Sequence, residues 1–137
     1  MSDSKIGVLS CSGEECLGGT IARLATRKML EKLRKDKTVT LCLPLYLAGG
    51  EEERSFAKDY PVITVDGCSK CCAKRATEKY SGKVSDTVIV SDVLGEDAAL
   101  SKIVSSKDLK KEHYQMVDKV ADEICQKFDK ITPEIEK

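Results

Sequence analysis

The chain has 137 residues, of which 41% are hydrophobic and 34% charged, as expected of one globular domain over residues 1–137 with a substantial core. Its 23 basic residues balance its 23 acidic residues, so no net field recruits nucleic acid or an anionic membrane, and we expect neither partner. No apolar run approaches the roughly 20 residues that cross a bilayer, and the start MSDSKIGVLSCSG lacks the pattern of a signal peptide, which favours a cytoplasmic protein.

The first half of the chain alternates strand and helix patterns. Residues 6–10 form a compact apolar run and predict a strand. Apolar residues between positions 17 and 33 recur at three- and four-residue spacing, which predicts an amphipathic helix. Residues 39–43 predict a second strand that Pro44 stops. Gly49-Gly50 then opens a short helix with three glutamates in its first turn.

The second half continues in the same way. Residues 61–65 predict a third strand, residues 72–80 a short helix, and residues 87–90 a fourth strand. We expect a further helix over residues 96–104 and a last helix from about 108 to 128, with Ser105 as its N-cap. A polar tail from about residue 130 is expected to fray.

Strands that are apolar throughout and separated by helices favour a parallel sheet covered on both faces. Right-handed crossovers leave few topologies for such a chain. We therefore expect a single α/β domain with a four-stranded, mainly parallel sheet in the order 2-1-3-4. Helices should cover both faces, as in flavodoxin-like and Rossmann-like folds. This order places Cys11 between Cys42 and Cys68.

Six of the seven cysteines lie at the ends of three predicted strands. They are Cys11 and Cys16 after the first strand, Cys42 at the end of the second, and Cys68, Cys71 and Cys72 after the third. The carboxyl ends of parallel strands meet at one edge of the sheet, where open α/β sheets place their ligand sites. Neighbouring strands lie about 4.8 Å apart, and two thiolates on one tetrahedral zinc lie roughly 3.8 Å apart. Cysteines from adjacent strand ends can therefore share a metal ion.

The total of seven cysteines also bears on how they are used. In a reducing compartment clustered cysteines are more often metal ligands or redox groups than disulfides, and an odd number agrees with this interpretation. Cys125 stands alone in the pattern of the last helix, where we expect it to pack as a small hydrophobic residue.

The strongest local motif is Asp-Gly-Cys-Ser-Lys-Cys-Cys at residues 66–72. It follows a predicted strand and opens a predicted helix, so free N–H groups and the helix dipole should favour thiolates there. The cations of Lys70, Lys74 and Arg75 would offset the charge of several thiolates around one divalent ion.

This arrangement resembles the DGC-domain family, for which zinc binding is expected. The matching segments are Cys11-Ser12-Gly13, Cys42, and Asp66-Gly67-Cys68 with Cys72, and the resemblance covers about residues 6–85. It implies a metal ion, Zn²⁺ in the first instance, held by Cys11, Cys42, Cys68 and Cys72. Cys16 and Cys71 are additional to the family pattern and are alternates for these ligands. The resemblance defines no activity, so whether the chain is an enzyme is left open.

Other chemistries compete with zinc binding. Cys68-Ser69-Lys70-Cys71 is a C-x-x-C motif, which favours a thiol redox or sulfur-handling enzyme that uses Cys68, Cys71 and Cys72. An iron–sulfur cluster or a metal-transfer role would use the same ligands. A further hypothesis is an interaction module whose metal ion fixes the loops, with a protein partner or a small thiol as its ligand.

Nucleotide binding and a cysteine nucleophile are disfavoured. Residues 13–20 have the spacing of a phosphate-binding loop, but Gly19 replaces its lysine, and Glu14 and Glu15 would repel phosphates. A cysteine protease needs a histidine partner. The only histidine, His113, lies in the last predicted helix and is expected to be a surface or packing residue.

Overall fold

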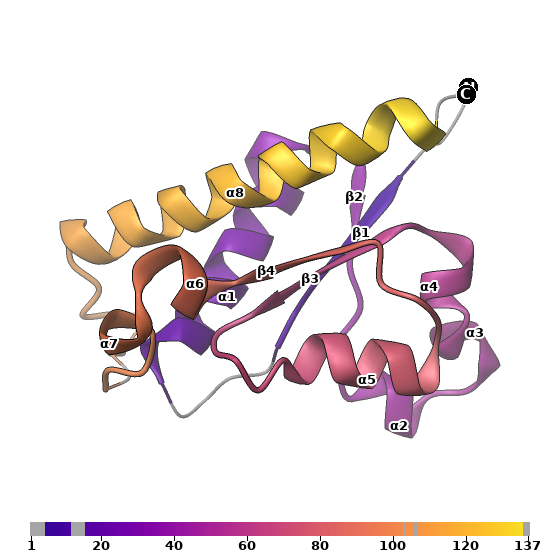
Figure 1. Cartoon of the computed structure of the whole chain (residues 1–137), viewed down its shortest axis with the longest axis horizontal. Helices are drawn as coiled ribbons and strands as arrows, with labels where there is room; N and C mark the ends of the chain where they lie inside the picture. Colours follow the sequence, from indigo (N-terminus) through magenta and orange to yellow (C-terminus); the bar gives the residue numbers. More distant parts are fainter. Residues whose placement is uncertain (1–4, 12–15, 103, 106, 136–137) are drawn as a thin grey trace.

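The computed structural model describes residues 5–11, 16–102, 104–105 and 107–135, with side chains as far as Thr132. Within these residues four strands form a parallel sheet in the order β2-β1-β3-β4 (Figure 1). The strands are β1 (Ile6–Ser10), β2 (Thr38–Val39), β3 (Val62–Asp66) and β4 (Asp86–Ile89). The strand order and the parallel direction predicted from the sequence are confirmed.

Helices connect the strands and close the chain. Helix α1 (Leu17–Lys28) follows β1 and continues as the π-helical segment η1 (Met29–Leu33). Between β2 and β3 lie α2 (Leu45–Ala48), α3 (Glu51–Arg54) and α4 (Phe56–Asp59). Helix α5 (Cys72–Tyr80) joins β3 to β4, and the chain ends with α6 (Val90–Leu94), α7 (Glu96–Ala99) and α8 (Lys111–Ile135).

Both faces of the sheet are covered, as Figure 1 shows: α1 and α8 lie on one face, and α5 with α2, α3 and α4 on the other. Successive strand residues point to opposite faces. Val8 and Ile63 accordingly belong to the core under α1 and α8, whereas Leu9 and Val62 belong to a second core with Tyr46. Burial on both faces explains why the central strands β1 and β3 are rich in apolar residues.

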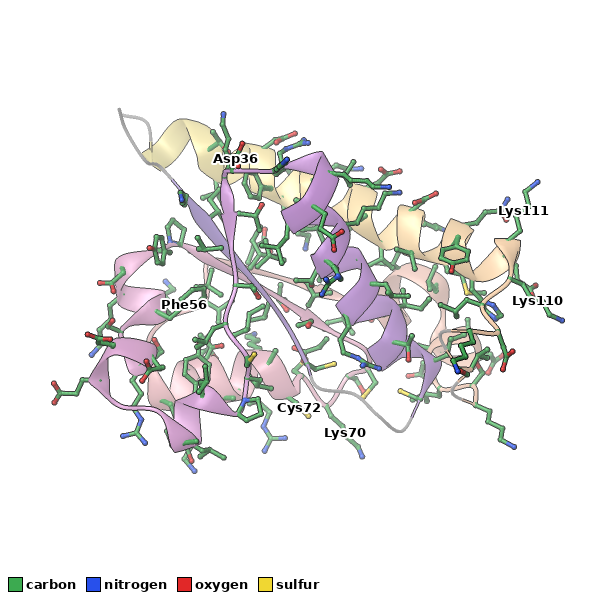
Figure 2. All side chains as sticks on the ribbon, turned by 180° about the vertical axis from the view of Figure 1, so that it is seen from behind. Asp36, Phe56, Lys70, Cys72, Lys110 and Lys111 are labelled. Carbon is green, nitrogen blue, oxygen red and sulfur yellow. The ribbon has the colours of Figure 1, made fainter. Side chains whose placement is uncertain are left out.

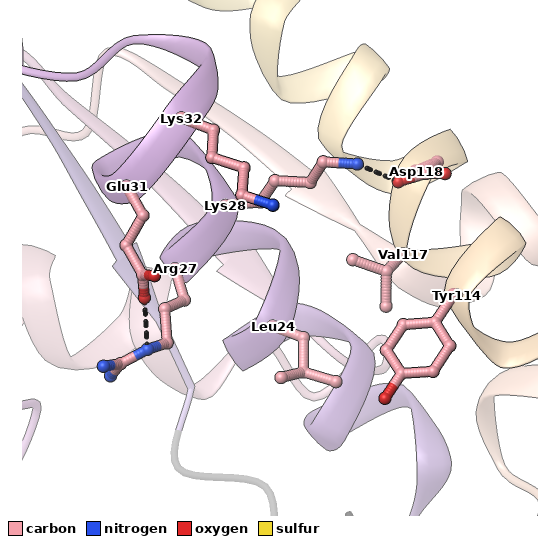
Figure 3. Close-up of a pocket in the computed structure, with 8 residues that line it drawn as sticks. All are labelled: Leu24, Arg27, Lys28, Glu31, Lys32, Tyr114, Val117 and Asp118. Atoms are coloured by element: carbon pink, nitrogen blue, oxygen red, sulfur yellow. Dashed lines mark hydrogen bonds and ion pairs between the residues drawn. The ribbon is translucent and has the colours of Figure 1, made fainter. Parts of the chain in front are cut away.

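Helices α1 and α8 meet along a groove in whose lining Figure 3 shows two ion pairs. Arg27 forms an ion pair with Glu31 on the same helix at 2.5 Å, and Lys28 pairs with Asp118 of α8. The apolar contact between the two helices continues into the core through Val117, which is buried. This packing fixes α1 on the sheet and so fixes where its first residues lie.

The second strand is shorter than predicted, because it ends at Val39 and not at residue 43. Beyond Val39 the chain leaves β1, and Leu41 and Leu43 pack against the core that contains Tyr46. The Leu45 N–H then donates to the Cys42 carbonyl at 2.9 Å, which turns the chain into α2. Cys42 is therefore exposed and lies outside the strand that was expected to present it.

Two helices near the end of the chain also differ from expectation. The helix predicted over residues 96–104 ends at Ala99, and α6 begins directly after β4; residue 103 lies outside the described residues. The last helix starts at Lys111, where the Lys110 N–H donates to His113 Nδ1 at 2.8 Å. Ser105 lies before it, with Oγ accepting from Lys107 N–H.

The polar tail expected to fray from about residue 130 is helical in the part that the structure describes, because α8 continues to Ile135. The side chain of Ile131 is buried in the core under α1 and α8. Its apolar contact supplies the free energy that keeps the last turns helical.

Candidate metal centre

The candidate metal site lies at the carboxyl ends of the neighbouring strands β1 and β3, where the connections that follow these two strands run in opposite directions. From β1 the chain passes to β2 on one side of the sheet, and from β3 it passes to β4 on the other. The crevice between the carboxyl ends of two such strands is where open α/β sheets bind ligands. Here β1 leads into Cys11 and β3 leads into Gly67 and Cys68, and the Cys11 N–H extends the pairing by donating to the Val65 carbonyl at 3.0 Å.

The Cys11 thiol lies against the turn that follows β3. Gly67 N–H donates to Cys11 Sγ at 3.3 Å, and only 7% of Cys11 is exposed. Metal-bound side chains are commonly oriented by hydrogen bonds of this kind. The structure thus brings Cys11 beside the residue that precedes Cys68, as the sequence predicted for these two cysteines.

Gly67 is required by the close approach of α1 to this turn. A Cβ atom at Gly67 would lie 2.6 Å from the nitrogen of Gly19, and one at Gly18 would lie 2.5 Å from the oxygen of Gly67. Backbone therefore packs on backbone, which only glycine permits. Two consecutive glycines at the start of a helix, Gly18 and Gly19, are a sequence pattern that could have predicted this close contact between backbones.

Asp66 is the last residue of β3, and its side chain caps the N-terminus of α5. Its carboxylate accepts hydrogen bonds from the N–H groups of Ala73 at 2.7 Å and Lys74 at 3.3 Å, in the first turn of the helix. An N-cap side chain normally satisfies these donors. Burial raises the pKa of Asp66, while the two backbone hydrogen bonds and the charge of Lys74 oppose that rise. The sequence motif was expected to follow a strand and open a helix, but this capping role of Asp66 was not predicted.

Cys71 holds the N-cap position of α5 in a left-handed conformation, with φ 52° and ψ 49°, and makes no side-chain capping bond. Asp66 satisfies the helix instead, so the Cys71 thiol is not used for capping. Burial, followed by the charge of Asp66, raises the pKa of Cys71. A C-x-x-C thiol at a helix start was expected to have a lowered pKa, and Cys71 shows the opposite shift.

The other candidate cysteines lie at different depths. Cys16 is the N-cap of α1 and, like Cys68, is half-buried. Cys72 is exposed at the first turn of α5, near Lys70 at the end of the molecule where β1 and β3 terminate (Figure 2). Cys42 has no contact with them among the interactions described, but the next residue, Leu43, lines a groove together with Cys72.

No disulfide joins the seven cysteines, all of which the structure describes. The sulfur atoms of Cys125 and Met29 lie 3.5 Å apart, and Cys125 packs against the core, as predicted. Over the described ranges no three Cys, His, Asp or Glu side chains gather closely enough to hold a metal ion. Residues 12–15, which include part of the Cys-Ser-Gly motif and of the phosphate-loop spacing, lie outside these ranges. The donor set itself, several thiols at one sheet edge, fits zinc or another soft metal ion.

A family model of the DGC domain matches residues 7–120. The chain belongs to the DGC domain family. The matched segment contains six of the cysteines and leaves out Cys125. Comparisons with curated proteins and with solved structures gave no match, so the assignment rests on the domain alone. None of the helices described here is long and apolar enough to cross a membrane.

Proposed function

We propose that this DGC-domain chain is a cytoplasmic protein that binds Zn²⁺ through cysteine thiolates at the crevice between β1 and β3. The observation that carries the proposal is the contact between Cys11 Sγ and Gly67 N–H, which joins the end of β1 to the turn that presents Cys68. Cys11 and Cys68 are the first two ligands. Cys72 and Cys42 complete the set, with Cys71 and Cys16 as the alternates.

The chemistry of the surroundings supports a thiolate-bound cation. Thiolates are the ligands that favour zinc over hard cations. Lys70 and Lys74 carry positive charge on the same turn and helix, which offsets the excess negative charge of several thiolates. An odd number of cysteines without disulfides agrees with a reducing compartment.

The metal ion serves a function beyond holding the fold. The central strands β1 and β3 are buried on both faces by two apolar cores, which supply burial of the kind that lets a domain fold without a metal ion. Small domains that depend on zinc for folding lack such cores. The location of the site at the strand ends is that of a ligand site.

The raised pKa of Cys71 disfavours this thiol as the attacking nucleophile of the redox alternative, which would then use Cys68 or Cys72 for the attack. Binding of a metal ion replaces the thiol proton, so a raised pKa makes metal loading depend on pH without preventing it.

Substitution of cobalt for zinc tests the proposal. Metal-free protein titrated with Co²⁺ under argon should develop sulfur-to-cobalt charge-transfer absorption and the visible bands of a tetrahedral site. Cys11→Ser and Cys68→Ser should each abolish most of this absorption, whereas Cys125→Ser, which removes a packing cysteine, should leave it unchanged. Comparison of Cys42→Ser with Cys71→Ser shows which of these two thiols completes the ligand set. Folded Cys11→Ser and Cys68→Ser proteins that bind Co²⁺ like the unmodified chain would contradict the proposal.

A further inference from the structure

A groove of about 310 Å³ runs along α5, on the face of the sheet opposite α1 and α8. One wall comes from the segment that leads through α2, and the other from α5. The lining residues are Leu43, Pro44, Tyr46, Leu47, Cys72, Ala76 and Tyr80. Unlike the groove between α1 and α8, its lining contains no acidic or basic side chain.

The shape of the groove follows from the sequence of α5. Cys72, Ala76 and Tyr80 are spaced by four residues and therefore share one face of the helix. At about 1.5 Å per residue, eight residues extend the groove to roughly 12 Å. Ala76 has the small side chain at its centre and leaves the space open. A thiol thus stands at one end of the groove and a phenol ring at the other.

Helix α2 presents two leucines to solvent, of which Leu47 lines the groove and Leu45 lies beside it in the chain outside the lining. Leu47 is 65% exposed and Leu45 is 37% exposed, although Tyr46 between them is fully buried. Helix α2 therefore anchors its middle residue in the core and presents its neighbours to solvent. Contiguous exposed apolar side chains of this kind mark binding surfaces.

Two cations lie at the Tyr80 end. The guanidinium carbon of Arg54 lies 5.8 Å from the centre of the Tyr80 ring, and Lys79 Nζ lies 5.3 Å from it. Arg54 Nε also donates to the Tyr46 carbonyl at 2.9 Å, which holds the guanidinium against the groove wall. The nearest acid on the chain before Arg54, Glu53, is bonded to the Gly50 N–H at 2.6 Å.

We propose that this groove binds a small apolar carboxylate, such as a medium-chain fatty acid. Its apolar chain would lie between α2 and α5, and its carboxylate would pair with Arg54 and Lys79. Small-molecule sites have volumes of about 300–1,000 Å³ and apolar walls with a few polar groups that fix orientation. The groove meets both conditions, because its walls are apolar and the cations of Arg54 and Lys79 lie beside the Tyr80 ring at one end. The inference does not depend on metal binding, since Cys72 only closes the far end.

The test is calorimetric titration of octanoate into metal-free protein, with 1-octanol as the uncharged probe. We expect octanoate to bind at least tenfold more tightly than 1-octanol. Ala76→Leu fills the groove with a good helix former and should weaken octanoate at least tenfold. Arg54→Gln combined with Lys79→Gln should reduce octanoate to the affinity of 1-octanol. Arg75→Gln removes an exposed cation of α5 five residues before Tyr80, and it should leave the affinity for octanoate unchanged.

Three results would overturn the inference. If octanoate does not bind at millimolar concentration, the groove is not a carboxylate site. If octanoate binds to Ala76→Leu with the same affinity as to the unmodified chain, its binding site lies elsewhere. Equal affinity for octanoate and 1-octanol removes the role of the cations. Sedimentation velocity adds one more outcome: a dimer that Leu47→Asp dissociates and octanoate does not would assign the surface to a second copy of the chain.

Discussion

Gly67 lies where the start of α1 meets the turn after β3, with room for no side chain. In Gly67→Ala the new Cβ would meet the nitrogen of Gly19 at 2.6 Å, so one of the two backbones must move. We expect a loss of about 2–3 kcal/mol in the free energy of unfolding, as for overpacked cores. Urea denaturation followed by circular dichroism measures it.

Gly82 provides the matched control for that substitution. A Cβ there would meet its nearest neighbour at 3.6 Å, which is ordinary contact. Gly82→Ala should therefore stay within about 0.5 kcal/mol of the unmodified chain. Equal stabilities of the two variants would show that the contact between α1 and the turn is looser than described.

Asp66 gives the protein a pH dependence that its asparagine variant lacks. Burial raises the pKa of this carboxyl in the folded chain above the value of about 3.9 for an unfolded aspartate. The folded chain therefore binds the proton more tightly, and the resulting stability is present below that value and is lost as the pH rises through the raised pKa. Relative to Asp66→Asn, the unmodified chain should lose stability on going from pH 4 to pH 7.

Chemical denaturation of both proteins at several pH values measures this difference, and other carboxyl groups cancel because both proteins contain them. A difference that stays constant over the range, or that grows in favour of the unmodified chain as the pH rises, would refute the assigned pKa direction.

The sequence predicted the thiols of this turn but not the task of the aspartate. A capping residue is expected next to the first turn of its helix. Asp66 instead reaches Ala73, seven positions later, because the turn folds back under α5. Such a contact depends on tertiary structure and has no local pattern. The same holds for the left-handed conformation of Cys71, a residue without the usual preference for it.

At the scale of elements, the bounds of one helix and one strand agree with prediction. Helix α5 begins and ends at the predicted residues 72 and 80, and β1 covers the predicted residues 6–10. The second strand was predicted too long, because an apolar run such as residues 39–43 is compatible with a strand or with a buried loop. Here Leu41 and Leu43 pack against the second core, which contains Tyr46, and the pairing with β1 ends at Val39.

The end of α8 was predicted too early for a related reason. Polar residues surround Ile131, so the periodic stripe appears to stop at Phe128, yet Ile131 is only 8% exposed. Ile131→Ala should cost about 2 kcal/mol, near the lower end of the range for a buried isoleucine, because the site is close to the helix end. Thermal unfolding checks the loss, with exposed Lys130→Ala as the control. Equal melting temperatures for both variants would mean that the last turns contribute nothing to the core.

For the whole molecule, the strand order could be predicted because alternating strands and helices with right-handed crossovers allow few arrangements. That order places the ends of β1 and β3 side by side and joins Cys11 to the turn before Cys68. The full ligand set could not be derived in the same way. Cys42 lies outside the strand that was predicted to contain it. Cys71 occupies the N-cap position of α5, but the side chain that accepts the hydrogen bond from the first turn of this helix is that of Asp66. These outcomes depend on packing between elements that are distant in the sequence.

The two apolar cores predict how the molecule responds when metal is removed. Because the sheet is buried on both faces without help from a metal ion, the chelated protein should keep its far-ultraviolet circular dichroism. Its melting temperature should fall, because bound zinc stabilises the folded chain by an amount that grows with the ratio of free zinc concentration to the dissociation constant.

The most direct test of zinc binding is elemental analysis of protein purified without oxygen, before and after chelation, with mass spectrometry of alkylated cysteines. We predict one zinc ion per chain, and alkylation of Cys68 that is slow in the zinc form and fast after chelation. Folded protein that contains no bound metal and cannot take up Zn²⁺, with Cys68 alkylated equally fast before and after chelation, would contradict the assignment.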